Sequence, residues 1–186
     1  LYLTYRGELR ESSNARLIKC KQLAQSDIPS KASLAQYEID DHIFEVYGNG
    51  RNPYAFILAD SNYRIEIAKF GAKLIPMAYC KISSETLTVL GADRAVQELT
   101  TLVSKLGSLD GPPSVSRADI CADFVTQADL AAISEKDFVT KARSFDRHTV
   151  RRQFSGFSFS ARAPLSARLY NKSLEMQCNY QRPYLE

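Results

Sequence analysis

The residues best suited to chemistry lie in one short segment near the end of the chain. Residues 166–172 read Ser-Ala-Arg-Leu-Tyr-Asn-Lys. If this segment is a strand, Arg168, Tyr170 and Lys172 project from the same face, because strand side chains alternate. Positive charge nearby lowers the pKa of a phenol from its usual value of about 10 and can also hold a phosphate. The pattern therefore predicts that Tyr170 attacks a phosphodiester, although a solvated edge strand would show the same triplet.

A second group of candidate residues is acidic. Residues 116–124 alternate apolar and polar side chains, which predicts a half-buried strand with Asp119 and Asp123 on its polar face. A strand advances about 3.3 Å per residue, so these carboxylates would lie about 13 Å apart and at most one would bind a given ion directly. Carboxylate oxygens favour Mg²⁺ or Mn²⁺. The alternative is a strand face that simply meets water. Further ligands would come from other segments: Glu66, Glu85 or Glu175.

Positive charge is concentrated in one part of the chain. Residues 141–172 carry eight Lys or Arg and one acid, a net charge of +7, whereas residues 1–140 have a net charge of −3. Phenylalanines are interleaved with these cations. Cations can follow a phosphate backbone while aromatic rings stack on unpaired bases, but phenylalanines facing a core and arginines facing water fit equally well. The cations are Lys141, Arg143, Arg147, Arg151, Arg152, Arg162, Arg168 and Lys172.

Composition is that of a globular protein. The chain has 186 residues, 45% of them hydrophobic and 24% charged, enough for one domain or two small ones. Its four cysteines lack a CxxC pair, so we interpret them as reduced thiols. No apolar run approaches the roughly 18 residues of a membrane span and no secretory pattern opens the sequence, so we expect a cytoplasmic protein. The start at Leu1 and the end at Glu186 indicate a piece of a longer protein.

Other catalytic classes are not supported by motifs. The sequence contains no GxSxG serine motif and no Walker or dinucleotide-binding loop. We interpret Gly48-Asn49-Gly50 as a turn, and Cys121 as a small packing residue of the alternating strand rather than a nucleophile.

The first part of the chain predicts strands and two helices. A helix over residues 12–25 has Ser12 or Ser13 as its cap, and a second helix over residues 92–106 has a continuous apolar stripe and ends at Gly107. The predicted strands are residues 1–5, 35–47, 54–59, 63–69 and 77–82.

The second part predicts a similar order of elements. Strands are expected over residues 116–124, 148–159 and 167–172, with a helix over 129–142 capped at Ser134 and another starting at 173. The whole chain is therefore expected to be one α+β domain, 1–186, with helices packed on one face of an antiparallel sheet. It would consist of two pseudo-repeated strand-helix-strand halves, 1–110 and 111–186.

Several segments together resemble the replication initiation factor family, which comprises rolling-circle replication initiators and related DNA relaxases of conjugative elements. The resemblance covers almost the whole chain and depends on the order and spacing of its motifs. It departs from the family after Ser155-Gly156-Phe157, where Ser160 and Ala161 stand in place of a glycine. The segments that carry it are residues 1–9, 76–87, 114–124, 138–143 and 167–172 with Glu175.

This resemblance implies a bacterial cytoplasmic enzyme that nicks one DNA strand by transesterification and leaves its tyrosine on the 5′ phosphate. Tyr170 matches the family's nucleophile. The implied metal ligands for Mg²⁺ or Mn²⁺ are Asp119, Asp123 and Glu175, and phosphate holding is implied for Arg117, Arg168 and Lys172. DNA, single-stranded or hairpin at the nick, is the implied partner; a homodimer, a helicase partner and the absence of membrane binding are further expectations. Together with the basic segment, the expected DNA-binding residues are Arg117, Lys141, Arg143, Arg151, Arg152, Arg168 and Lys172.

Two alternatives remain open at the level of sequence. One is a DNA-binding module of the same fold that does not cleave, in which the basic segment binds and the acids are solvated. The other is a ferredoxin-like RNA-binding domain, in which exposed aromatic residues of a sheet stack on bases. The second alternative requires aromatic residues and arginines on the same face, whereas Phe124 is expected on the face opposite Arg117.

Overall fold

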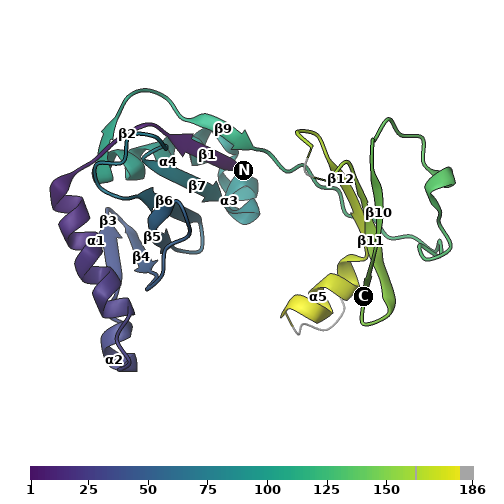
Figure 1. Ribbon diagram of the computed structural model, residues 1–186, viewed down its shortest axis with the longest axis horizontal. Coiled ribbons are helices and arrows are strands. Elements are labelled where there is room, and N and C mark those ends of the chain that lie inside the picture. The colour runs from purple at the N-terminus through teal and green to yellow at the C-terminus, as the bar shows by residue number, and fades with distance from the viewer. Residues whose placement is uncertain (162, 181–186) are drawn as a thin grey trace. The chain divides into compact units, whose positions relative to one another are not determined.

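The computed structural model describes residues 1–161 and 163–180, and the side chains of this range except those of residues 178–180. Arg162 of the basic segment and the Cys178 thiol therefore lie outside the described part. The chain divides into two compact units, unit 1 Leu1–Cys121 and unit 2 Ala122–Glu186 (Figure 1). The fold class is α+β, with a large antiparallel sheet and a few helices.

Unit 1 is built on a seven-stranded antiparallel sheet with the spatial order β3-β4-β5-β6-β7-β1-β9. The first strand lies inside the sheet because it pairs with β7 on one side and with β9 on the other. Its strands are β1 Tyr2–Tyr5, β3 Gln36–Ile39, β4 His42–Val46, β5 Tyr54–Ala59, β6 Tyr63–Ala68, β7 Ala78–Ile82 and β9 Ser114–Arg117.

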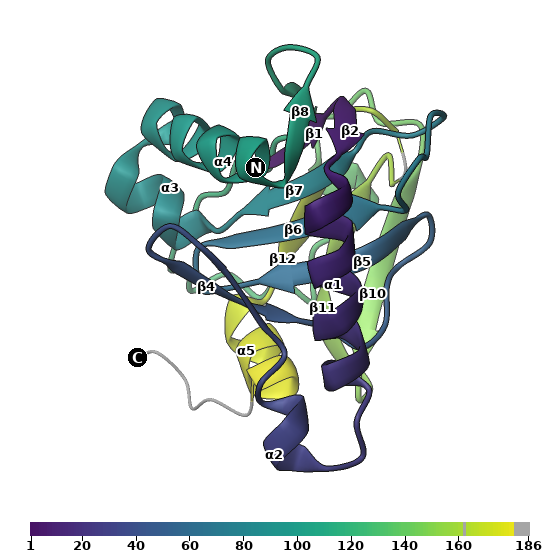
Figure 2. The ribbon, with the colours of Figure 1, turned by 90° about the vertical axis from the view of Figure 1, so that its left-hand side faces the viewer.

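Helices cover one face of this sheet. α1 and α4 lie across the same face (Figure 2), and their buried side chains join those of the strands in one hydrophobic cluster. Within it Leu17 of α1 and Leu99 of α4 are fully buried. The helices of unit 1 are α1 Glu11–Ala24, α2 Pro29–Ala32, α3 Ser84–Leu90 and α4 Ala92–Leu106; a separate pair, β2 Gly7–Leu9 and β8 Gly107–Leu109, joins the start of α1 to the end of α4.

Unit 2 contains a three-stranded antiparallel sheet, β10-β11-β12, followed by one helix. Phenylalanine rings from this sheet and from Phe138 pack on one another, and Phe157 is 1% exposed. The phenylalanines of the basic segment therefore form a small core, as one of the two interpretations of their pattern required. The elements are η1 Glu135–Asp137, β10 Phe145–Val150, β11 Gln153–Phe159, β12 Ala167–Tyr170 and α5 Lys172–Tyr180.

The strand expected over residues 116–124 is wrong beyond Arg117. β9 ends there because its partner β1 begins at Tyr2, the residue paired with Arg117, so later residues have no opposing residue on that strand. Residues 118–134 form neither strand nor helix, and Ile120 is 99% exposed. Apolar alternation without a neighbouring strand did not produce sheet structure.

The helix expected over residues 129–142 is also wrong. Only η1 forms, closed by Ser134, whose backbone N–H donates to Asp137 Oδ2 at 2.7 Å and whose hydroxyl lies 3.0 Å from the same oxygen. The expected cap is present, but Val139 is fully exposed, and a short helix without a packed face is marginal in water.

Smaller expectations also need correction. The cap of α1 is not Ser12 or Ser13 but Arg10, which makes no capping bond through its side chain. The single strands expected over 35–47 and 148–159 are each a hairpin, β3–β4 and β10–β11. The strand expected over 167–172 ends at Tyr170, so Lys172 begins α5 and does not share a strand face with Arg168 and Tyr170. The pseudo-repeat is not confirmed, since one unit has a seven-stranded sheet and the other a three-stranded one.

Candidate active site

Tyr170 is the last residue of β12, and Asn171 alone separates it from the start of α5 at Lys172. Its side chain is 38% exposed, so the phenol is open to solvent rather than buried in the Phe core. The Arg168 guanidinium carbon lies 5.9 Å and Lys172 Nζ 5.7 Å from the centre of its ring. These distances are within the range of cation–π attraction. Two positive charges therefore lie beside the Tyr170 ring, one from β12 and one from α5.

A hydrogen-bond chain fixes where the strand ends and the helix begins. The Asn171 backbone N–H donates to Ser155 O at 2.9 Å, which holds this residue to β11. The Asn171 side chain then accepts from the Leu174 N–H at 3.0 Å and caps α5. Leu174, in the first turn of α5, is buried. Tyr170 is therefore attached to a defined corner rather than to a loose loop.

Gly156 makes the close approach of β12 possible, which the sequence interpretation did not recognise. It pairs with Tyr170, and a Cβ added to it would lie 2.5 Å from Leu169 O and 2.7 Å from Tyr170 Cβ. Any side chain here would push β12 away. The signal was visible in the sequence, because a glycine inside a strand often marks a close backbone approach.

Ser160 has a glycine-like backbone conformation. Ser160 follows β11 with φ of +50°, a left-handed conformation that favours glycine. Its hydroxyl accepts the Arg143 backbone N–H at 3.2 Å, and its own N–H donates to Ser144 O at 2.9 Å. These bonds hold the turn in the conformation that a glycine would adopt more easily.

Two arginines form the tip of the β10–β11 hairpin. Arg151 and Arg152 occupy its two-residue turn with φ of +51° and +66°, and both are exposed. A turn with positive φ at both positions favours Asn-Gly, so two arginines here carry strain. Strained residues that present charge to solvent are candidates for a binding role.

The other basic residues of unit 2 have less regular surroundings. Lys141 and Arg143 lie on residues 138–144, which form no strand or helix, and both side chains are exposed. Arg147 donates to Ala131 O at 2.8 Å and lies over the Phe154 ring, so this cation supports the fold.

The expected metal ligands are divided between the two units. In unit 1, Asp119 Oδ1 accepts the Arg117 Nε–H at 2.6 Å. In unit 2, Glu175 Oε2 accepts from Lys172 Nζ at 2.7 Å, and this bond is the main cause that raises the pKa of Lys172, with the neighbouring Tyr170 phenol adding to it. Asp123 lies in unit 2 on the irregular segment after Cys121.

The expected ligands are carboxylates, which can bind a divalent metal, but the described residues show no cluster of three such ligands. Carboxylate oxygens are appropriate for Mg²⁺ or Mn²⁺. Over residues 1–161 and 163–180, however, no three His, Cys, Asp or Glu side chains come together in a metal-binding group. Glu66, another candidate, is 4% exposed and accepts from Arg64 Nε at 3.0 Å, so it neutralises arginine.

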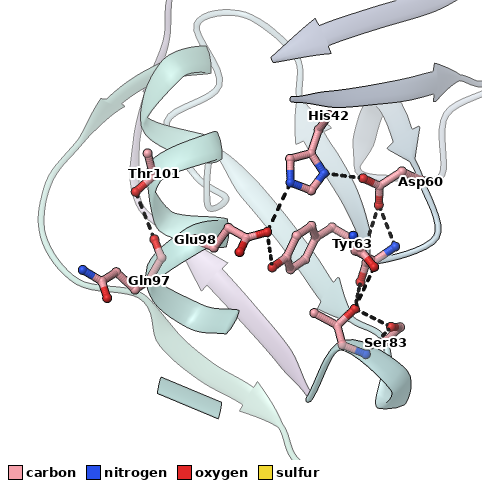
Figure 3. A network of polar contacts seen from close by, with 9 residues as sticks. His42, Asp60, Tyr63, Ser83, Gln97, Glu98 and Thr101 are labelled. Atoms are coloured by element: carbon pink, nitrogen blue, oxygen red, sulfur yellow. Dashed lines mark hydrogen bonds and ion pairs between the residues drawn. The ribbon is translucent and has the colours of Figure 1, made fainter. Parts of the chain in front are cut away.

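The densest polar network of unit 1 is structural (Figure 3). His42 of β4 has Nδ1 2.6 Å from Asp60 Oδ2 and Nε2 3.2 Å from Glu98 Oε1, and the Tyr63 hydroxyl donates to the same Glu98 oxygen at 3.0 Å. Asp60 also accepts two backbone N–H groups of its own turn. Burial, followed by Glu98, raises the pKa of Tyr63, which keeps this phenol a neutral donor. The network ties α4 to the sheet and offers no free nucleophile.

Of the helices in the described residues, none combines the length and apolar composition that crossing a bilayer requires. No protein-family model matches the sequence, and comparisons with curated proteins and with solved structures find no match.

Proposed function

We propose that this chain nicks one strand of DNA through Tyr170 and so starts rolling-circle replication or DNA transfer in the bacterial cytoplasm. The observation that carries the proposal is the exposed Tyr170 phenol, fixed at the β12–α5 corner between Arg168 and Lys172. The motif resemblance supports the choice of DNA as substrate. DNA is an anion, and the cations of unit 2 complement it.

The proposed step is a transesterification that conserves bond number. The Tyr170 Oη forms a bond to the scissile phosphorus as the phenol loses its proton, and the bond from phosphorus to the 3′ oxygen breaks. The departing oxygen takes up a proton and becomes a 3′ hydroxyl. Arg168 and Lys172 hold the phosphate and offset the charge that develops on it. Because the phosphodiester energy is kept in the phosphotyrosine bond, the strand can be rejoined without ATP.

A divalent ion, Mg²⁺ or Mn²⁺, is part of the proposal. Asp123 and Glu175, the two expected ligands in unit 2, would supply oxygen ligands, and the ion would polarise the scissile phosphate. Binding would require Glu175 to share or release its present partner, Lys172.

The test is covalent trapping on an end-labelled single-stranded oligonucleotide with Mn²⁺, resolved on a denaturing gel. Wild type should form a protein–DNA adduct, and Tyr170→Phe should form none while it binds the oligonucleotide normally. Tyr47→Phe is a matched control, because Tyr47 is 37% exposed and has the Arg64 guanidinium 5.4 Å from its ring. An undiminished adduct with Tyr170→Phe would assign the chemistry to another residue.

One observation favours a second candidate, a DNA-binding module that does not cleave. Asp119 and Glu175 both neutralise neighbouring cations in the structure, as expected of acids with a purely structural role. In that case wild type would bind the oligonucleotide with a steep salt dependence and yield no adduct at any Mn²⁺ concentration.

A further inference from the structure

The face of the unit 1 sheet opposite α1 and α4 carries a row of three tyrosines, here named the tyrosine row: Tyr2, Tyr79 and Tyr54. Strand register places them together, because residues paired across antiparallel strands share a face. Tyr2 pairs with Lys81, two residues from Tyr79, while Glu66 and Ala68 of β6 pair with Tyr79 and Tyr54. Ring centres are 5.9 Å apart for Tyr2 and Tyr79, and 6.0 Å for Tyr79 and Tyr54.

The tyrosine row is accessible to solvent. All of its rings are half-buried, so each keeps one part of its surface open to solvent. Burial, and then the Glu66 carboxylate, raises the pKa of Tyr54. An aromatic ring on an open sheet is a platform on which any base can stack, because every base has a flat π face.

Cations surround the tyrosine row. The Arg117 guanidinium carbon lies 5.3 Å and Lys81 Nζ 5.9 Å from the centre of the Tyr2 ring. At the other end, Arg51 is 70% exposed. With Arg64 there are four cations against two acids, Glu66 and Asp119. A shallow pocket of about 270 Å³ opens among these residues, lined by Tyr2, Arg51, Arg64, Glu66, Tyr79 and Lys81.

Glu66 keeps two of these cations on the face. Its carboxylate is 4% exposed, accepts the Arg64 Nε–H at 3.0 Å and lies 3.7 Å from Arg51 Nη1. A buried carboxylate is costly unless it is paired, so the arginines are held beside the rings rather than free to extend into solvent. The face thus combines fixed cations with open rings.

We propose that the tyrosine row and its cations bind unpaired nucleotides of single-stranded DNA, with bases on the rings and phosphates on Arg51, Lys81 and Arg117. Charge complementarity identifies a polyanion, and the rings identify one with exposed bases, since a duplex hides its base faces. The choice of DNA over RNA rests on the proposed function. The stacking itself does not, and it lies in a different unit from Tyr170.

The test measures fluorescence anisotropy of a labelled 12-nucleotide oligo(dT), with every variant made in the Tyr170→Phe protein so that no strand is cut. Tyr79→Leu should weaken binding about 5- to 150-fold, because stacking on one aromatic ring contributes about 1–3 kcal/mol per base. Tyr79→Phe should bind like its parent, since it keeps the ring. Phe70→Leu, a half-exposed aromatic of the loop after β6, is the control for loss of a ring elsewhere.

A second pair of variants tests the cations without touching the rings. Lys81→Ala should lower the slope of log affinity against log salt by about 0.7, the value for one phosphate contact to a single strand. Lys19→Ala removes an exposed cation from α1, on the covered face of the sheet, and should leave the slope unchanged.

Three results would overturn the inference: parental binding by both Tyr79→Leu and Lys81→Ala, duplex binding as tight as single-strand binding, or tighter binding of oligo(U) than of oligo(dT). The last would replace DNA by RNA as the ligand. Failure here is distinct from failure of the nicking proposal. A wild-type adduct with Tyr79-independent binding refutes only this surface, and Tyr79-dependent binding without any adduct refutes only the nicking.

Discussion

Replacing Gly156 by alanine tests whether the contact between β11 and β12 sets the position of Tyr170. The added methyl would lie 2.5 Å from Leu169 O and 2.8 Å from Tyr170 Cα, against about 3.4 Å for ordinary contact, so β12 must move by about 0.9 Å. Backbone atoms are not free to rotate away as a side chain would. The displacement is therefore passed directly to the tyrosine.

The expected loss of activity follows from this displacement. A misplacement of about 1 Å at a reacting group costs about 100-fold in rate, so we expect single-turnover nicking by Gly156→Ala to be about 100-fold slower. Binding of oligo(dT) should be unchanged, because the tyrosine row lies in the other unit. Quench-flow nicking and anisotropy on the same preparation separate the two effects.

Gly111→Ala is the matched control. Gly111 has φ of +159° and Gly156 has φ of +157°, but a Cβ at Gly111 meets no atom of the described chain within 4 Å. Both variants therefore carry the same backbone strain, and only Gly156→Ala adds overpacking of about 1–3 kcal/mol. Hydrogen exchange followed by mass spectrometry reports each unit separately. Nicking by Gly156→Ala at the wild-type rate, or an equal loss of protection in both variants, would refute this account of how Tyr170 is positioned.

Three further predictions concern the hairpin tip, the His42 network and the metal. Replacing Arg151–Arg152 by Asn-Gly should stabilise unit 2 by about 1–2 kcal/mol, because it relieves the strain of positive φ. The same change should lower the slope of log DNA affinity against log salt by about 1.4, and an unchanged slope would show that the hairpin tip does not contact phosphate. His42→Ala should lower the free energy of unfolding of unit 1 by about 2–4 kcal/mol in urea, because Asp60 and Glu98 lose their shared partner. His148→Ala, at an exposed site, should lower the free energy of unfolding by less than about 1 kcal/mol, and equal losses would contradict a stabilising role for the His42 network. Asp123→Asn should remove Mn²⁺-stimulated nicking while Asp27→Asn, in an exposed loop, should not. Equal wild-type rates with and without chelator would reject the metal.

Elements with strong local signals were predicted from the sequence. The helix expected over residues 92–106 has those bounds in the structure, because its apolar stripe is continuous and glycines stand at both ends. The strands around the turn at Asp60 were also predicted within a residue. In these cases local preference and burial against the sheet agree.

Elements that depend on a distant partner could not be predicted in this way. The alternation over 116–124 has the right period, but β9 can extend only as far as β1 offers a partner. The β10–β11 hairpin was missed because its turn contains two arginines instead of Asn or Gly, so no turn signal interrupts the segment.

The same distinction between local spacing and distant partners applies to the functional residues. Tyr170 and its two cations were identified from local spacing, and their grouping is visible because all lie within five residues. The tyrosine row was not identified, since its members are far apart in sequence and meet only through the register of β1, β7, β6 and β5. The sequence contains the residues of such a face, but strand order decides which of them are neighbours.

The position of β9 has a mechanical consequence. This four-residue strand is at the edge of its sheet, pairs with β1 among the described strands, and lies just before the chain passes into unit 2. Tension pulling the units apart, as when a tethered strand is unwound, would enter unit 1 at Arg117 and peel β9 off bond by bond. Its first effect would be to move the Arg117 guanidinium away from Tyr2. Nucleotide binding by the proposed surface would therefore weaken under tension before the rest of the sheet unfolds.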